Sequence, residues 1–130
     1  MNYFQSQRSE AASLDFDRPR TVAFYARITS LHRDQDFARD LQVQCFETQL
    51  RLHPGWRSAG IYMDRPDPAS GSRPNFSRML ADAAGHKFDL VVAADTHSFS
   101  RSAVDLLFTV RQLEALGTEV FFCKRKHSLL

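Results

Sequence analysis

The sequence predicts an α/β domain of three layers, in which a mainly parallel sheet of four to five strands carries helices on both faces. Short segments rich in β-branched and aromatic residues alternate with segments of helical periodicity. The resulting order, β-α-β-α-β-α-β, requires crossover connections and therefore parallel strands. A chain of 130 residues, 43% of them hydrophobic, is long enough for one domain with its own core.

The first half of the chain supplies two strands and one helix. Residues 1–20 are polar and charged without periodicity, and we expect a loose leader there. The segment 21–28, TVAFYARI, has the β-branched and aromatic composition of a strand. Apolar residues recur at three-to-four spacing over 37–52, which predicts an amphipathic helix ended by Pro54-Gly55. A second strand is predicted over 58–63.

A loop and a helix follow, and then a buried strand. Three prolines and a glycine in DRPDPASGSRP, residues 64–74, predict a loop. Apolar residues between Phe76 and Ala83 have helical spacing, and Gly85 is the expected C-cap of that helix. The segment 88–94, FDLVVAA, is continuously apolar from its third residue, which indicates a strand covered on both faces.

The last part of the domain repeats the pattern. Residues 95–101 are polar and are predicted to form a loop. Ser102 and Asp105 resemble a capping box at the start of a helix that Gly117 ends. The closing strand is predicted over 119–123. The folded domain is therefore expected to span 21–123, followed by a basic tail, KRKHSLL, over 124–130.

Composition excludes several classes of protein. The two cysteines and five histidines are scattered, without CxxC or paired-histidine spacing, so we expect no metal and no other cofactor. Neither a signal peptide nor an apolar run of about 20 residues is present, which favours a cytoplasmic protein without membrane contact. A net charge of +2 is too small to identify a nucleic-acid partner by itself.

Arginines and hydroxyls gather in the three loops that follow predicted strands. In parallel sheets, functional sites form in the loops beyond the carboxyl ends of the strands. Arginine can stabilise charge on phosphoryl oxygens, and a hydroxyl can act as a nucleophile or simply bond its own backbone in a turn. Three such loops at one edge favour a phosphate-handling site. The residues concerned are Arg27, Thr29 and Ser30; Ser70, Ser72 and Arg73; and Ser98, Ser100 and Arg101.

Several motifs resemble those of one protein family, in the same order and with similar spacing. They are YARIT, LQVQ, SGSRP, FDLVVAAD, SRSAVDLL and LEALGTEVFF, which together span residues 21–122. This pattern is similar to the N-terminal catalytic domain of the serine site-specific DNA recombinases, the resolvase/invertase family. In that family a serine hydroxyl attacks the scissile phosphate and forms a covalent protein–DNA link. The strands are rejoined after subunit rotation. The resemblance implies DNA as the partner.

The resemblance also implies roles for individual residues. Thr29 occupies the nucleophile position, and three arginines correspond to the catalytic, phosphate-binding arginines of the family: Arg27, Arg73 and Arg101. Four polar residues correspond to positions expected to contact DNA or its phosphates: Ser30, Gln44, Ser70 and Ser98.

The chain departs from the family pattern at positions that matter for catalysis. Threonine replaces serine at position 29, and its extra methyl restricts χ1 and crowds an in-line attack. His97 and Ser98 stand where the family has Asp-Arg, and losing a positioned cationic donor costs on the order of 10²–10³ in rate. The loop around Ser70 also looks rearranged. These departures leave open whether the chain is an active enzyme.

The length of the chain raises a second question. Family members continue into a long helix that forms the dimer and then into a DNA-binding region, whereas this chain stops at Leu130. We therefore expect weak DNA binding and weak or no self-association here, in contrast to the dimers and tetramers of the full-length family. Three hypotheses follow: a degenerate or truncated recombination domain, an inactive resolvase-like DNA-binding or regulatory module, or an unrelated α/β domain that binds a phosphorylated ligand. The absence of GxGxxG and P-loop patterns counts against the third.

Overall fold

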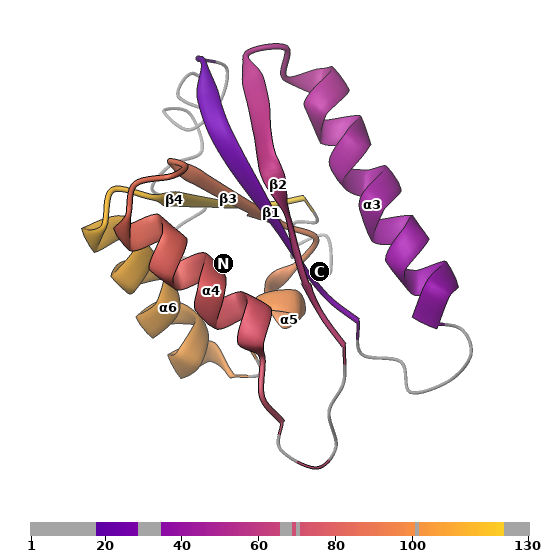
Figure 1. The fold of residues 1–130 in the computed structure, drawn as a ribbon, viewed down its shortest axis with the longest axis vertical. Helices are drawn as coiled ribbons and strands as arrows, with labels where there is room; N and C mark the ends of the chain where they lie inside the picture. Colours follow the sequence, from indigo (N-terminus) through magenta and orange to yellow (C-terminus); the bar gives the residue numbers. More distant parts are fainter. Residues whose placement is uncertain (1–17, 29–34, 66–68, 70, 101, 124–130) are drawn as a thin grey trace.

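Four parallel strands form the centre of the molecule, in the order β2-β1-β3-β4 (Figure 1). The computed structural model describes residues 18–28, 35–65, 69, 71–100 and 102–123. The strands are β1 (Arg20–Arg27), β2 (Trp56–Asp64), β3 (Leu90–Ala93) and β4 (Glu119–Phe122). The helices are α3 (Gln35–Leu52), α4 (Pro74–Ala84), α5 (Thr96–Phe99) and α6 (Ala103–Ala115). The predicted α/β fold with a parallel sheet is confirmed.

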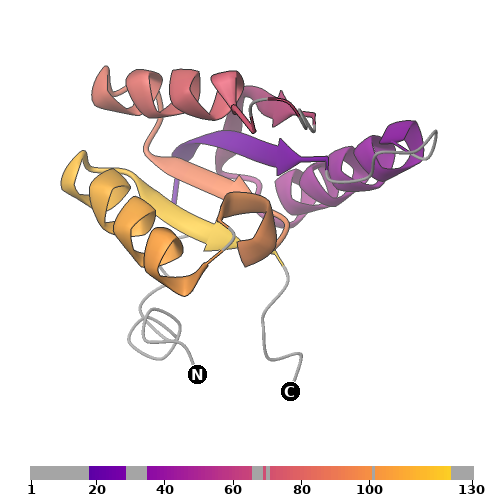
Figure 2. The same cartoon turned by 90° about the horizontal axis from the view of Figure 1, so that it is seen from below.

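Helices cover both faces of the sheet, and each face has its own core. Figures 1 and 2 show α3 set apart from α4 and α6. On β1, Val22 and Phe24 point to the face that Phe46 of α3 covers. Ala23 and Tyr25 point to the other face, where side chains of α4, α5 and α6 pack. This alternation along one strand produces the three layers.

The first strand begins one residue earlier than predicted. Arg20, predicted to be the last residue of the leader, pairs in register with Trp56, and its backbone N–H donates to the Gly55 carbonyl at 3.1 Å. Its side chain is 1% exposed and forms ion pairs with Asp89, at 3.4 Å, and with Glu119. Such a buried charge is tolerated because it is paired. Arg20 therefore belongs to the folded domain.

A β-bulge in β2 changes which residues of that strand face α4. The register shifts at this point: Val22 pairs with Ser58, but Ala23 pairs with Gly60. Gly60 has φ of +128°, a conformation that favours glycine. One extra residue inverts the alternation, so Trp56 joins the core under α3 while Tyr62 joins the core under α4. Asp64 has the same parity as Tyr62, and the bulge thus directs it toward α4.

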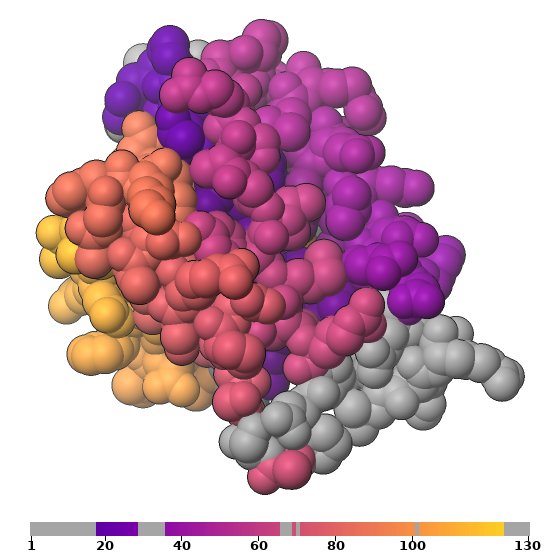
Figure 3. All heavy atoms as spheres, viewed as in Figure 1, coloured from indigo at the N-terminus to yellow at the C-terminus, as the bar shows by residue number. Residues whose placement is uncertain are grey.

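Edge strand β2 lies at the surface between α4 and α3 (Figure 3). Its middle residues, 57–59 and Ile61, are exposed. The bulge sits in this exposed stretch, and bulges of this kind discourage edge-to-edge pairing with other chains.

The end of α4 differs in detail from the prediction. Gly85 is the C-cap, as expected, but its φ is −85° and His86 takes the left-handed conformation with φ of 58°. The N–H groups of His86 and Lys87 donate to the carbonyls of Ala83 and Asp82, which closes the helix in a Schellman arrangement. Histidine is one of the residues that adopt this conformation more readily than most.

The predicted loop over 95–101 contains a short helix, so that prediction was wrong for residues 96–99. Helix α5 forms because the Asp95 side chain accepts a hydrogen bond from the Ser98 backbone N–H at 3.0 Å. The start of α6 is as predicted. There the Ser102 hydroxyl accepts from the Asp105 N–H at 3.1 Å.

Candidate functional site

The carboxyl edge of the sheet brings together the ends of β1 and β2. Arg27 and Asp64 are the last residues of these strands and are paired in register. Arg27 has the same parity as Tyr25, so both lie on the face that α4 and α5 cover. Arg73 directly precedes α4 on that face. Two of the arginines singled out from the sequence, Arg27 and Arg73, therefore lie on one face at one edge.

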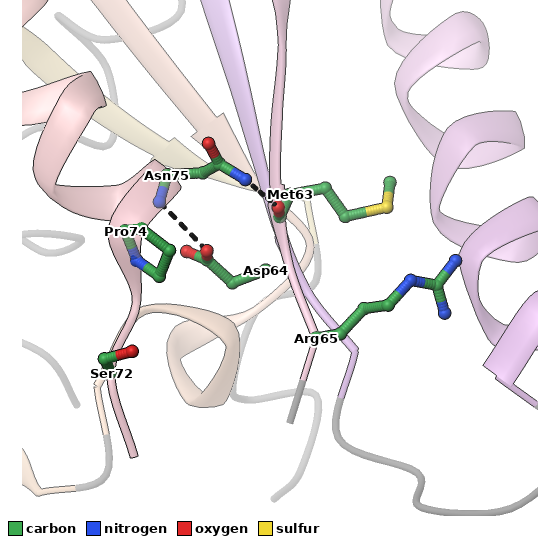
Figure 4. A pocket seen from close by; sticks show the side chains of 6 residues that line it. All are labelled: Met63, Asp64, Arg65, Ser72, Pro74 and Asn75. Carbon is green, nitrogen blue, oxygen red and sulfur yellow. Dashed lines mark hydrogen bonds between the residues drawn. The ribbon is translucent and has the colours of Figure 1, made fainter. Parts of the chain in front are cut away.

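Asp64 accepts several hydrogen bonds at this edge. It is 4% exposed, and its carboxylate accepts hydrogen bonds from the Tyr25 hydroxyl at 2.8 Å and from the N–H groups of Asn75 and Phe76 at 3.0 and 2.9 Å. Figure 4 shows the Asp64 carboxylate beside the backbone nitrogen of Asn75, while the Asn75 side chain points to the Met63 carbonyl. Helix α4 has no side-chain cap of its own at Arg73, and Asp64 supplies that cap from β2. Asp64 is not among the site residues predicted from the sequence.

Arg73 is held by contacts from two helices. Its Nη1 donates to the Phe99 carbonyl at 2.7 Å, and its guanidinium carbon lies 3.9 Å from the centre of the Phe76 ring. The rings of Tyr25, Phe76 and Phe99 meet one another edge to face beneath it. Such contacts fix a side chain that would otherwise sample many rotamers. Arg73 is half-buried, so part of the guanidinium remains accessible.

Burial raises the pKa of the Tyr25 hydroxyl, and the hydrogen bond to Asp64 raises it further. The nearby Arg73 guanidinium acts in the opposite direction and lowers this pKa, but the net direction is upward. The hydroxyl therefore stays protonated and can serve as a hydrogen-bond donor to Asp64 at neutral pH.

The tyrosines give a testable pH dependence. Burial and the hydrogen bond to Asp82 raise the pKa of Tyr62 to about 12. Because the pKa of Tyr62 is higher in the folded state than in the unfolded state, the protonated hydroxyl stabilises the folded state. This stabilisation is complete below about pH 10 and is lost as the pH rises through 12. We expect the phenolate absorbance step that disappears in Tyr62→Phe to be centred near pH 12 in the native protein. A step near the ordinary value of about 10 would contradict this assignment.

Ser98 is buried, and Asp95 engages both its N–H and its hydroxyl. The side chain is 6% exposed overall, with Oγ 3.3 Å from the Asp95 carboxylate oxygen that also accepts the backbone N–H. His97, beside it, is exposed. At the position where the family has an arginine, this chain thus has a small residue whose hydrogen bonds serve the start of α5.

Gln44 lies away from the carboxyl edge, where Arg27, Asp64 and Arg73 are found. It is exposed on α3, which packs against the opposite face of the sheet. The neighbouring Gln42 does contact the edge, because its Nε2 donates to the Arg27 carbonyl at 3.3 Å. The structure therefore places Gln42, and not Gln44, against the end of β1.

A pocket of about 410 Å³ opens beside Asp64, between the end of β2 and the start of α4 (Figure 4). Its lining residues are Met63, Asp64, Arg65, Ser72, Pro74 and Asn75. The Arg65 side chain points away from Asp64, toward α3, where it lies 3.7 Å from the Asp36 carboxylate. The carboxylate of Asp64 already accepts three hydrogen bonds from the protein, so the other polar side chains that line the pocket beside it are the Ser72 hydroxyl and the Asn75 amide.

Four of the predicted site residues lie outside the described residues: Thr29, Ser30, Ser70 and Arg101. Within the described ranges, no three side chains of His, Cys, Asp or Glu gather in a way that could hold a metal ion. None of the described helices has the length and apolar character needed to span a bilayer.

Comparison with known proteins identifies the family. A family model described as "Resolvase, N terminal domain" matches residues 22–128. The chain therefore belongs to the resolvase family, and it is a site-specific recombination domain of that family. None of the curated proteins matches this chain.

Solved structures have the same fold. A resolvase family site-specific recombinase from Streptococcus pneumoniae is 21% identical with a TM-score of 0.69, over 79% of this chain and 71% of that one. The N-terminal catalytic domain of TP901-1 integrase is 23% identical with a TM-score of 0.66, over 84% and 86%. The C-terminal catalytic domain of ISC1926 TnpA, an IS607-like serine recombinase, is 15% identical with a TM-score of 0.68, over 81% and 70%. At these identities the likeness establishes the shared fold.

Proposed function

We propose that this domain cuts and rejoins DNA strands through a covalent link between DNA and the hydroxyl of Thr29. In the cutting step the hydroxyl gives up its proton, its oxygen bonds to the scissile phosphorus, and the bond from phosphorus to a deoxyribose oxygen breaks. The released deoxyribose hydroxyl reverses the step when it attacks the protein–DNA phosphodiester. Bonds to phosphorus are exchanged without net hydrolysis, so no cofactor is consumed.

The proposed phosphate ligands are the arginines Arg27, Arg73 and Arg101. One observation carries the proposal: Arg73 is held by the Phe99 carbonyl and the Phe76 ring, on the same face and edge as Arg27. A preorganised guanidinium stabilises charge that develops on phosphoryl oxygens without reorganising during the reaction. Ser30 and Ser70 are proposed to add hydroxyl contacts to the DNA phosphates.

A second candidate function is a resolvase-like DNA-binding or regulatory module without strand cleavage. The environment of Ser98 favours this alternative. Serine carries no charge, so this position lacks the cationic donor that the family resemblance implies there. The hydroxyl and N–H of Ser98 instead both contact Asp95. The two candidates share DNA as the partner and differ in whether a covalent adduct forms. For the recombination function we propose homodimers or tetramers of the full-length form, because exchange of strands requires more than one DNA-bound copy.

The substitution Thr29→Ser tests the choice between the candidates. It removes the methyl group that crowds the attack and restores the hydroxyl of the family, so we expect the yield of covalent adduct to increase from a low level. The protein is incubated with supercoiled DNA that carries a nick at a known crossover site, and adducts are resolved on denaturing gels.

Thr29→Ala and Ser30→Ala are the matched controls. We expect Thr29→Ala to abolish any adduct and Ser30→Ala to preserve it, because Thr29 occupies the nucleophile position that the family resemblance implies. An adduct that Ser30→Ala abolishes and Thr29→Ala leaves intact would show that the nucleophile is Ser30.

A further inference from the structure

We propose that Asp64 and Tyr25 form a positioning unit that fixes Arg73 relative to the end of β1. Neither residue is proposed to touch DNA. The inference rests on the proposed function for the role of Arg73 as a phosphate ligand, and it concerns how that arginine is kept in place.

Asp64 joins the bases of two loops that carry site residues. Its backbone carbonyl accepts from the Ile28 N–H at 2.9 Å, immediately after Arg27, where the first loop begins. Its carboxylate accepts from Asn75 and Phe76, two and three residues after Arg73, where the second loop has ended and α4 has begun. Asp64, from which the second loop starts, thus also binds the residues that follow the end of that loop. One buried residue thereby sets the spacing between the backbones at Arg27 and Arg73.

Additional contacts make this junction rigid. The Asn75 side chain donates to the Met63 carbonyl at 2.7 Å, so the first turn of α4 is bonded to β2 through both its backbone and a side chain. Tyr25 is fully buried in the neighbouring strand, and its hydroxyl supplies the third hydrogen bond to the Asp64 carboxylate. Each oxygen of Asp64 accepts an N–H from α4, and the oxygen that bonds Phe76 also accepts the Tyr25 hydroxyl.

The Arg73 side chain depends on the same group of residues. Its guanidinium lies over Phe76, whose N–H bonds to Asp64, and Phe76 and Phe99 both pack edge to face on the Tyr25 ring. A shift of Tyr25 or Asp64 would therefore move the ring beneath Arg73 and the carbonyl that it donates to. This chain of contacts predicts that the effects of Tyr25 and Arg73 on phosphate binding are coupled.

A double-mutant cycle tests the coupling. The probe is a short DNA duplex of arbitrary sequence at low salt, where binding depends on phosphate contacts. We expect Arg73→Gln to weaken binding about tenfold, as for a lost charge-assisted hydrogen bond. Tyr25→Phe, which removes one oxygen, should weaken binding about threefold, within the range for one lost hydrogen bond. The double variant should bind as weakly as Arg73→Gln alone, because Tyr25 acts only through Arg73.

Tyr62→Phe is the matched control. It removes a tyrosine hydroxyl that donates to Asp82, also between β2 and α4, but near the other end of that helix. We expect it to lower stability about as much as Tyr25→Phe and to leave DNA binding unchanged. Equal weakening by the two substitutions would indicate a general structural effect and would overturn the proposal.

A spectroscopic measurement reads the position of Arg73 without DNA. In labelled protein, hydrogen exchange at the Arg73 guanidinium should be faster in Tyr25→Phe than in the wild type and unchanged in Tyr62→Phe. Additive losses in the binding cycle, or unchanged exchange at Arg73, would overturn the proposed positioning role. Neither measurement needs strand cleavage. Both can therefore support or overturn the positioning role even if the adduct assay shows no covalent chemistry.

Discussion

Restoring the family residues His97→Asp and Ser98→Arg in Thr29→Ser protein should raise the rate of adduct formation by on the order of 10²–10³. The gain comes from the cationic donor at position 98, which stabilises charge on the scissile phosphate. The assay requires a cognate site, so the domain is fused to the dimerisation helix and DNA-binding region of a relative.

A longer side chain at position 98 should lower stability but leave the start of α5 intact. Ser98 is buried, so arginine and glutamine should both crowd its neighbours. The cap of α5 should survive, because Asp95 keeps its bond to the backbone N–H of residue 98. Ser98→Gln is the control: it adds a long side chain without a charge, so it should show the same loss of stability without raising the rate. A fully restored chain that forms no adduct on a cognate site would contradict the catalytic proposal.

Arg73→Gln should lower the rate of adduct formation by on the order of 10²–10³ when introduced into the Thr29→Ser protein. Glutamine keeps a hydrogen-bond donor near the Phe99 carbonyl but loses the charge and the contact with the Phe76 ring. We expect the free energy of unfolding to fall by about 1–2 kcal/mol, measured by urea titration, since one hydrogen bond and one cation–π contact are weakened.

Arg78→Gln provides the comparison for Arg73. Arg78 lies on the same helix, with its guanidinium 5.4 Å from the ring of Tyr62 instead of at the carboxyl edge. We expect it to leave the adduct rate unchanged. A similar loss of rate in both variants would show that Arg73 acts through general charge or stability and not through a defined contact with phosphate.

The order and type of the main elements could be predicted because local sequence determines them. Helix α3 ends before Pro54, α6 begins after the Ser102 cap, and β3 reads as a continuous apolar run. Helix α5 was missed because four polar and aromatic residues have no visible periodicity, and its formation depends on the single side chain of Asp95. The bulge before Gly60 was missed because a bulge is defined by pairing with β1, which a single strand does not reveal.

The location of the candidate site could be predicted from the sequence, but not all of its residues. Strand ends and the family resemblance pointed to Arg27 and Arg73, which do lie at one edge. Asp64 was treated as the first residue of a loop, because its role depends on contacts with residues 39 and 12 positions away in the chain. A signal was present nonetheless: an aspartate at the end of a strand, followed about ten residues later by a helix without a local N-cap. Local sequence patterns do not identify which distant residue supplies a cap of this kind.

The position of the covalent link between protein and DNA shows directly which hydroxyl is the nucleophile. Adducts formed by the wild-type chain or by Thr29→Ser protein are digested with protease and nuclease, and the modified peptide is sequenced by mass spectrometry. We expect a nucleotide attached through phosphate to the hydroxyl of residue 29, and no such peptide from Arg73→Gln protein under the same conditions. Attachment at any other residue, or a restored and DNA-bound chain that yields no modified peptide, would contradict it.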